Sequence, residues 1–371
     1  MPALAPPVPE SLAADVSPVV SGAGRSVALD AYRGLIMIFL VSVGFGFGPL
    51  KDHPVWGLAA HQVDHVPWTG MVLWDLIQPA FMFMVGVAMP YSFAGRSSQG
   101  AGFWNNFGHV VRRCLILVFL SQVFVAAGSG KYQFGLINVL SQIAFTYLIC
   151  FLLMQTSMIS QVCAAIGLLS THWALFMAFP GPEGPFSATG NVGQVIDQWL
   201  LGRTYPGNYV TINFISSAVT TLFGVWAGTL LRGSRPLNDK IRVLLWSACG
   251  CITGGMLLGL VNPMVKRIWT ASFTIYSAGF VLLGLVAMIW LVDGKGYKRL
   301  AFPLVVVGMN SMFAYCVSQM FRGSINRAVG VFTGKFEWIG TLAPVFHACA
   351  TLGVIWWMCY WLYRRKAFLK V

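Results

Sequence analysis

About ten apolar stretches, each close to 20 residues long, follow one another along this chain of 371 residues. A helix needs about 20 apolar residues to cross the hydrocarbon core of a bilayer. The stretches lie at residues 28–50, 69–94, 106–127, 134–155, 158–179, 209–231, 242–262, 270–292, 301–321 and 341–363. The sequence therefore predicts an all-α, polytopic membrane bundle of about ten transmembrane helices. We expect one domain over residues 25–371, preceded by a disordered N-terminal tail over residues 1–24.

Composition excludes a water-soluble globule. Hydrophobic residues make up 57% of the chain and charged residues only 9%, whereas soluble domains carry about 25% charged residues. The net charge of +13 is explained by the Lys and Arg that cytoplasmic loops of membrane proteins collect, so we expect no nucleic-acid partner. The eight cysteines lie in or beside apolar runs without C-x-x-C spacing and predict no disulfide framework.

The 24 Lys and Arg residues are divided unevenly between the two sides of the predicted bundle. If the N-terminus and every second loop share one side, that side holds about twice as many basic residues as the opposite side. By the positive-inside rule this side is cytoplasmic. Both termini are then predicted inside, and the loop around His65 is predicted outside.

His65 and Asp75 are the residues most suited to chemistry. Asp75 lies about a turn and a half past Gly70, at the start of an apolar run, where an unpaired carboxylate is costly. His65 can act as a general base or nucleophile near neutral pH, and Asp75 could orient its ring. Alternatively, His65 is an interfacial histidine and Asp75 a hydrogen-bonded anchor at a helix N-terminus.

The run from His61 to His65 also departs only slightly from H-x-x-E-H, an inverted zinc-protease motif. Asp64 takes the place of the Glu, however, and the sequence offers no third ligand. We therefore expect no metal.

Several other polar residues lie within or beside the apolar runs. Asp30 and Arg33 open the first run three residues apart and can form a structural ion pair. Alternatively, Arg33 could face an anionic cosubstrate together with basic loop residues such as Arg112 and Arg113, because Arg binds phosphate in a bidentate manner. Asn213 and Asn310 could hold helices together or line a polar cavity. A long outer loop at residues 180–208, with a short amphipathic helix over 194–202, is predicted to form a lid.

Pairs of glycines four residues apart are predicted to let helices approach closely. They are Gly224 and Gly228, Gly250 and Gly254, and Gly255 and Gly259.

From residue 26 to the C-terminus the chain resembles the heparan-α-glucosaminide N-acetyltransferase group of transmembrane acyltransferases. The resemblance rests on motifs that occur in family order. They are Leu29-Asp30-Ala31-Tyr32-Arg33-Gly34-Leu35, His65-Val66-Pro67-Trp68-Thr69-Gly70, Asp75-Leu76 with Pro79, Ile196-Asp197, Ile212-Asn213, Gly224-Val225-Trp226-Ala227-Gly228, Trp269-Thr270-Ala271-Ser272, Gly308-Met309-Asn310-Ser311 and Leu362-Tyr363-Arg364-Arg365-Lys366. Two positions depart from the family pattern. Gly44 stands where relatives have Asn, and Ser318-Gln319 where they have His-Glu.

The resemblance implies transfer of an acetyl group from cytoplasmic acetyl-CoA to an amino sugar or glycan on the extracytoplasmic side. His65 would be the catalytic centre and Asp75 its support. The substrate would be bound by Trp68 and Trp269, which stack on the sugar, and by Asn213 and Asn310. The cosubstrate would be bound by Asp30, Arg33, Arg112 and Arg113.

The large luminal portion of the lysosomal relatives is missing before the first motif, so we expect a protein of the bacterial inner membrane. Its acceptor need not be heparan sulfate, and N- or O-acetylation, directly or through an acetyl-histidine, and a homodimer all stay open.

A transporter or flippase of small glycans or lipids is the alternative function. In that hypothesis Asp30, Arg33, Asp75 and Asn310 line a permeation route.

Overall fold

The computed structural model describes residues 26–369, apart from the side chains of residues 129 and 335, and the predicted tail at 1–24 lies outside it. Within that range the chain is helical except for one bridge between Gly181 and Gly184. The longer helices are α2 (Val27–Ser42), α4 (Ile77–Ser97), α5 (Phe103–Ser129), α6 (Val139–Leu153), α7 (Met158–Ala178), α9 (Phe214–Arg232), α10 (Leu237–Gly259), α11 (Ala271–Met288), α12 (Lys298–Met309), α13 (Ser311–Thr333) and α14 (Ala343–Arg364).

The connections between these helices contain short helical turns. They are η1 (Gly44–Gly46), η2 (Gly48–Leu50), α3 (Gly57–Gln62), η3 (Leu73–Leu76), α8 (Val192–Leu201), η4 (Pro206–Asn208), η5 (Thr211–Asn213), the π-helical η6 (Ile289–Gly294) and η7 (Gly334–Leu342). Several helices begin at a side-chain cap: Ser26, Asn138, Ser157 and Asn191 each accept a backbone N–H of the first turn.

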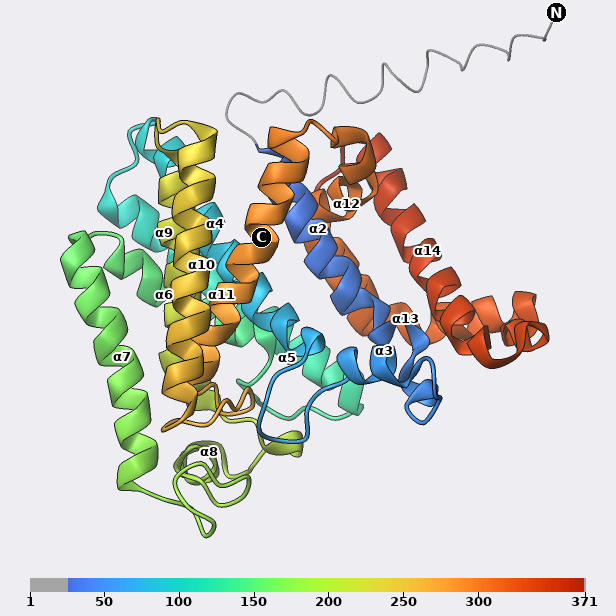
Figure 1. Ribbon diagram of the computed structural model, residues 1–371, viewed down its shortest axis with the longest axis horizontal. Helices are drawn as coiled ribbons and strands as arrows, with labels where there is room; N and C mark the ends of the chain where they lie inside the picture. The colour runs from blue at the N-terminus through green and yellow to red at the C-terminus, as the bar shows by residue number, and fades with distance from the viewer. Residues whose placement is uncertain (1–25, 370–371) are drawn as a thin grey trace, which may run out of the picture.

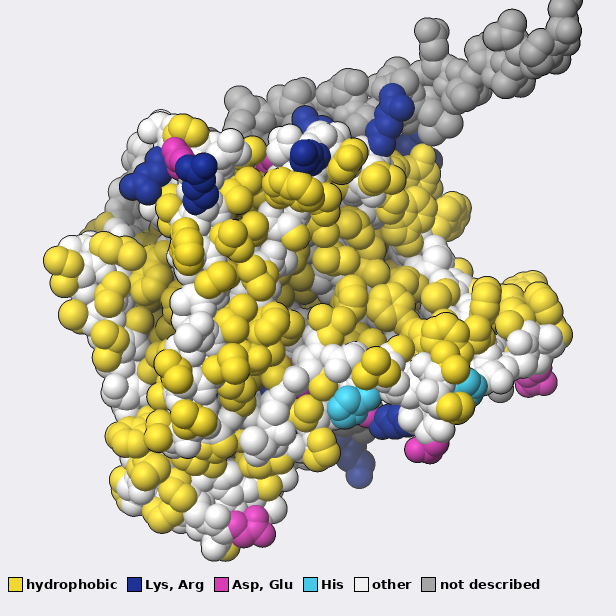
Figure 2. Space-filling model, viewed as in Figure 1, with side chains coloured by type: hydrophobic (Ala, Val, Ile, Leu, Met, Phe, Trp, Pro, Cys, Tyr) yellow, Lys and Arg dark blue, Asp and Glu magenta, His cyan; other side chains and the backbone are white. Residues whose placement is uncertain are grey.

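The protein is a multi-pass integral membrane protein built from helices. Seven helices of the described chain are long and apolar enough to cross a bilayer, and the number is eight if α12 and α13, bent by 65° at Asn310, count as one span. Hydrophobic side chains cover the middle of the molecule, while Lys and Arg gather at its upper end (Figure 2). The predicted all-α membrane bundle is thus confirmed in its class.

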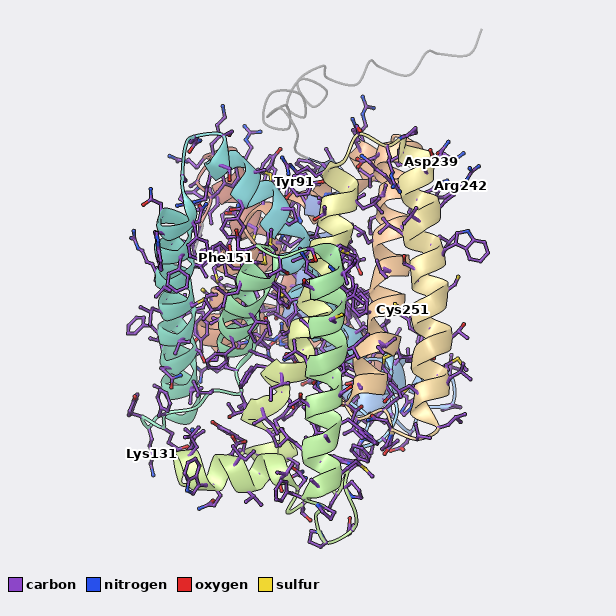
Figure 3. All side chains as sticks on the ribbon, turned by 90° about the vertical axis from the view of Figure 1, so that its left-hand side faces the viewer. Tyr91, Lys131, Phe151, Asp239, Arg242 and Cys251 are labelled. Atoms are coloured by element: carbon purple, nitrogen blue, oxygen red, sulfur yellow. The ribbon has the colours of Figure 1, made fainter. Side chains whose placement is uncertain are left out.

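The helices form two groups that meet along α4, α11 and α2 (Figure 1). On one side α4 packs on α9 and α10 on α11, and on the other α2 packs on α12 and α13 on α14. We call the end with the α4–α5, α9–α10 and α11–α12 connections the basic end, and the end with α3 and α8 the loop end. Asp239 and Arg242 lie at the basic end and Lys131 at the loop end (Figure 3).

Glycines bring the central helices into backbone contact. A Cβ at Gly86 would overlap the Thr221 carbonyl, and a Cβ at Gly224 would overlap the Phe83 carbonyl, so α4 and α9 are in close contact. The same holds between α2 and α12, where Gly308 lies against the Asp30 carbonyl. Small residues permit this approach in membranes, where apolar burial drives helix association only weakly.

The prediction was wrong for one of the other glycine pairs. A Cβ at Gly250 or Gly254 would meet no atom within 4 Å, so neither residue allows a close contact between helices. In contrast, Gly255 lies against Tyr276 of α11. The spacing therefore identified the α10–α11 contact but assigned it to too many glycines.

The first helix is shorter than the apolar run predicts. The run extends to residue 50, but α2 ends at Ser42 because Val43, Gly44, Phe45 and Gly46 all have positive φ angles. Arg322 of α13 donates to the carbonyls of Val41 and Ser42 and so satisfies the end of the helix.

We predict that Gly224→Ala destabilises the bundle and that Gly353→Ala does not. The added methyl group overlaps the Phe83 carbonyl in the first case and meets nothing within 4 Å in the second. Overpacking of this kind costs about 1–3 kcal/mol. Thermal unfolding in detergent should show a lower midpoint for Gly224→Ala only, and equal midpoints for the two variants would contradict the packing described here.

Candidate active site

The two residues that the sequence singled out meet at the loop end. Asp75 lies in η3, at the start of α4, and His65 lies in the preceding histidine loop (residues 63–72). Nδ1 of His65 is 2.6 Å from Oδ1 of Asp75. The Asp75 side chain is 1% exposed, while the His65 side chain is 38% exposed. A buried carboxylate thus holds an imidazole whose other edge reaches solvent.

A third charged group completes the cluster, and sequence reasoning missed it. Lys266 lies in the loop between α10 and α11 (residues 260–270, the lysine loop). Its Nζ is 3.2 Å from Nδ1 of His65 and 3.3 Å from Oδ1 of Asp75, and its side chain is 6% exposed. Burial lowers the pKa of Lys266 to about 8, although the nearby Asp75 carboxylate raises it. The sequence had counted this lysine only as one of the outer loop charges.

Hydrogen bonds from two other segments fix the lysine loop. The Gly70 N–H, in the histidine loop, donates to the Met264 carbonyl at 2.8 Å. At the start of α9, Asn213 donates to the Arg267 carbonyl at 2.7 Å and Ser216 donates to the Trp269 carbonyl at 2.5 Å. These bonds join the histidine and lysine loops to each other and to α9, so Lys266 is positioned by the fold and not only by its charge.

Trp269 takes an unusual backbone conformation beside the site. Its φ is 52°, a region that costs an L-residue about 1–2 kcal/mol. The indole is buried and donates to the Thr220 hydroxyl, which compensates for this strain. Strain that surrounding contacts enforce in this way clusters at functional sites.

The contacts define which edge of the imidazole is free. Because an ionised carboxylate only accepts, the 2.6 Å contact with Asp75 puts the proton on Nδ1, and the Lys266 ammonium beside that nitrogen then donates to Oδ1 of Asp75 at 3.3 Å. The neutral ring then carries its lone pair on Nε2. With Asp75 ionised and Lys266 protonated, the cluster has no net charge when the imidazole is neutral. This arrangement suits an imidazole that accepts a proton or attacks a carbonyl carbon.

The predicted lid contains the short helix, as expected. Helix α8 begins at Asn191, whose side chain caps it, and its buried Asp197 accepts the Thr211 N–H at 3.0 Å. Burial raises the pKa of Asp197. Trp68 of the histidine loop donates to the Phe186 carbonyl at 2.9 Å. The loop at residues 180–208 therefore lies against the histidine loop at Trp68, three residues from His65.

The other three residues predicted to bind the substrate are buried. Trp269 is 1% exposed and Asn310 0%, so neither presents a free surface to a sugar. Neither amide atom of Asn310, at the bend between α12 and α13, has a hydrogen-bond partner among the described residues. Asn213, in η5, donates to the Arg267 carbonyl of the lysine loop.

The four predicted cosubstrate residues fall into two places. Asp30 and Arg33 form an ion pair of 3.1 Å at the basic end of α2. Arg112 and Arg113 lie on α5, where the Arg113 guanidinium stacks 4.4 Å from the ring centre of Tyr147 in α6. Of the four residues, Arg113 is therefore engaged in a contact that joins α5 to α6.

The residues of the zinc-like motif do not converge. His61 is exposed in α3, and Asp64 forms an ion pair with Lys51, whose hydrogen bond lowers the pKa of Asp64. The described chain contains no group of three His, Cys, Asp or Glu residues that could hold a metal ion.

An apolar crevice of about 170 Å³ runs between α2, α4 and α11. At one end it is lined by Leu73 and Leu76, which belong to the same helical turn η3 as Asp75, and at the other by Tyr32 and Gly284. Tyr32 adjoins Arg33 in sequence. The crevice therefore extends from beside the charged cluster toward the basic end.

Comparison with known proteins agrees with the resemblance seen in the motifs. The chain is 22% identical to heparan-alpha-glucosaminide N-acetyltransferase of Homo sapiens and 24% identical to that of Mus musculus, over 94% and 98% of its length. The chain is thus distantly similar to these enzymes over nearly its whole length. It spans 60% and 63% of their lengths. No family profile matches the sequence.

We predict that Lys266→Met destabilises the protein far more than Lys51→Met. Removing one partner of a buried ion pair costs about 3–5 kcal/mol, whereas the Lys51–Asp64 pair is half exposed on both sides and is worth at most about 1 kcal/mol. Thermal unfolding in detergent measures both. The double variant Asp75→Asn/Lys266→Met should recover part of the loss, and simple additivity of the two single effects would argue against coupling.

Proposed function

We propose that this protein is a membrane-embedded acyltransferase that moves an acetyl group from acetyl-CoA to an amino sugar or glycan. The observation that carries the proposal is the Asp75-held imidazole of His65, with Nε2 free at an exposed edge. A distant relationship to acetyltransferases over nearly the whole chain supports the same reaction class.

The two chemical routes use the same ring atom. In direct transfer, Nε2 of His65 removes a proton from the acceptor amine or hydroxyl while that group attacks the thioester carbon, and the CoA sulfur leaves and takes up the proton. In the two-step route, Nε2 itself attacks the thioester and CoA leaves as a thiolate. The acceptor then attacks the acetyl-imidazolium, the neutral ring leaves, and the proton that the acceptor loses is taken up by the thiolate. In both routes Asp75 holds the ring, and the Lys266 ammonium balances the negative charge of the Asp75 carboxylate.

The crevice between α2, α4 and α11 supports a route for the donor from the basic end. Between Tyr32 and Phe39, which both line it, α2 rises about 10 Å. A pantetheine arm would follow this apolar wall, with its phosphates near Arg33. The ion pair with Asp30 would hold that arginine in place. Arg112 and Arg113 on α5 would contribute positive charge at the same end.

The acceptor would enter at the loop end beneath α8. Trp68 lies beside the lid and would provide an aromatic face for a sugar ring. In this proposal Trp269, Asn213 and Asn310 position the site from within, since all three are buried.

We propose ten membrane passes. Besides the seven long spans and the bent α12–α13 pair, the proposal counts α2 and α6, which have 16 and 15 residues. By the positive-inside rule, the excess of Lys and Arg at the basic end supports a cytoplasmic position for that end and for both termini. In a bacterial inner membrane the acetyl group would then cross from the cytoplasmic donor to an extracytoplasmic acceptor.

We predict that His65→Ala abolishes acetyl transfer and that His61→Ala preserves it. The second histidine is four residues away and exposed, which makes it a matched control. Proteoliposomes with labelled acetyl-CoA inside and a panel of amino sugars outside would report transfer as labelled sugar. Near-normal labelling by folded His65→Ala would rule out the assigned role, and accumulation of unmodified sugar would favour transport.

We predict that transfer declines as the pH rises through about 8. Burial lowers the pKa of Lys266 to about 8, so the ammonium is present below that pH and lost above it, whereas a free lysine keeps its proton to about pH 10.4. Arginine stays charged above pH 12. Lys266→Arg should therefore extend the active range upward, and Lys51→Arg should not. An unchanged decline in Lys266→Arg would exclude Lys266 as its cause.

A further inference from the structure

A groove on the membrane-facing surface is distinct from the site described above. It consists of two cavities of about 590 and 510 Å³ that share Met158, Trp226 and Leu230. Helix α9 forms its floor, and α7 and α10 form its walls. This α7–α10 groove lies on the side of the bundle seen in Figure 3, where Cys251, one of its lining residues, is labelled.

The two halves of the groove differ in chemistry. The lower cavity is lined by apolar residues of α9, α10 and α11, with Ser247 and Cys251 as its most polar members. The upper cavity opens at the basic end and includes Arg235 and Ser234, in the turn between α9 and α10. Arg235 is exposed, and none of the residues that line either cavity is acidic.

The length of the groove matches one leaflet of a bilayer. From Phe223, in the lower cavity, to Arg232, at the end of α9, the helix rises about 14 Å. Half of the hydrocarbon core measures about 15 Å. A molecule with its charge at Arg235 would therefore extend its apolar part to about the bilayer midplane.

Gly250 leaves open space in the wall of the lower cavity. It lines the lower cavity in the middle of α10, where glycine costs about 1 kcal/mol relative to alanine. A Cβ there would meet no protein atom within 4 Å. Packing within the chain therefore does not require the glycine, whereas a ligand lying along α10 would benefit from the space.

We propose that the α7–α10 groove binds a phospholipid with an anionic headgroup. The headgroup phosphate pairs with the Arg235 guanidinium, and an acyl chain lies along α9 past Gly250. Trp226 of α9 donates to Gln161 of α7 at 2.8 Å and so joins the floor to one wall where the two cavities meet.

Native mass spectrometry of the full chain in mild detergent tests this, with phosphatidylglycerol and phosphatidylcholine of identical acyl chains as probes. Wild-type protein should retain phosphatidylglycerol about fivefold more than phosphatidylcholine, since one Lys or Arg near an anionic surface contributes about that factor. Gly250→Leu fills the groove and should lose most of the retained lipid. Arg235→Gln should keep lipid but lose the preference for phosphatidylglycerol.

Two matched variants serve as controls. Gly353→Leu places the same side chain at an open position on α14, and Arg299→Gln removes an exposed charge at the same end of the bundle; both should retain lipid as wild type does. Equal retention of the two lipids by wild type, undiminished retention by Gly250→Leu, or displacement of lipid by acetyl-CoA would overturn the proposal. None of these measurements depends on acetyl transfer, so they are independent of the function proposed for His65.

Discussion

The carboxylate of Asp75 is the group on which the rest of the site depends. An ionised carboxylate that is 1% exposed at the edge of a bilayer is costly to bury unless it is paired and hydrogen-bonded. His65 and Lys266 supply both kinds of partner, although they are 201 residues apart in the sequence. The histidine loop and the lysine loop must therefore meet at the start of α4 for the folded state to be stable.

The packing of the transmembrane helices is what brings those loops together. Glycines of α4 and α9 set the two helices in backbone contact. The start of α9 then lies beside the start of α4, and Asn213 and Ser216 bind the lysine loop there. A change in the α4–α9 distance would move Lys266 away from Asp75. Stability of the bundle and geometry of the site are thus coupled through a few named contacts.

Sequence reasoning identified those features that have a local signal. An apolar run with one carboxylate pointed to Asp75, and a nearby titratable ring pointed to His65. Lys266 had no such signal, because a loop lysine looks the same whether it is solvated or buried, and only long-range packing distinguishes the two. The early end of α2 was missed for a similar reason: apolar residues continue past Ser42, but four positive φ angles stop the helix. Gly250 and Gly254 had the spacing of contact glycines without a partner helix.

The short α2 also bears on how a donor at one end of the bundle can reach an imidazole at the other. Its 16 residues rise about 24 Å, less than the ~30 Å hydrocarbon core. The crevice is lined by α2 residues from Tyr32, beside the ion pair of Asp30 and Arg33, to Phe39, one turn before the helix ends. A helix that ran to residue 50, as the apolar pattern suggests, would be about 12 Å longer. Ending α2 at Ser42 instead lets the chain turn through η1 and η2 toward the histidine loop.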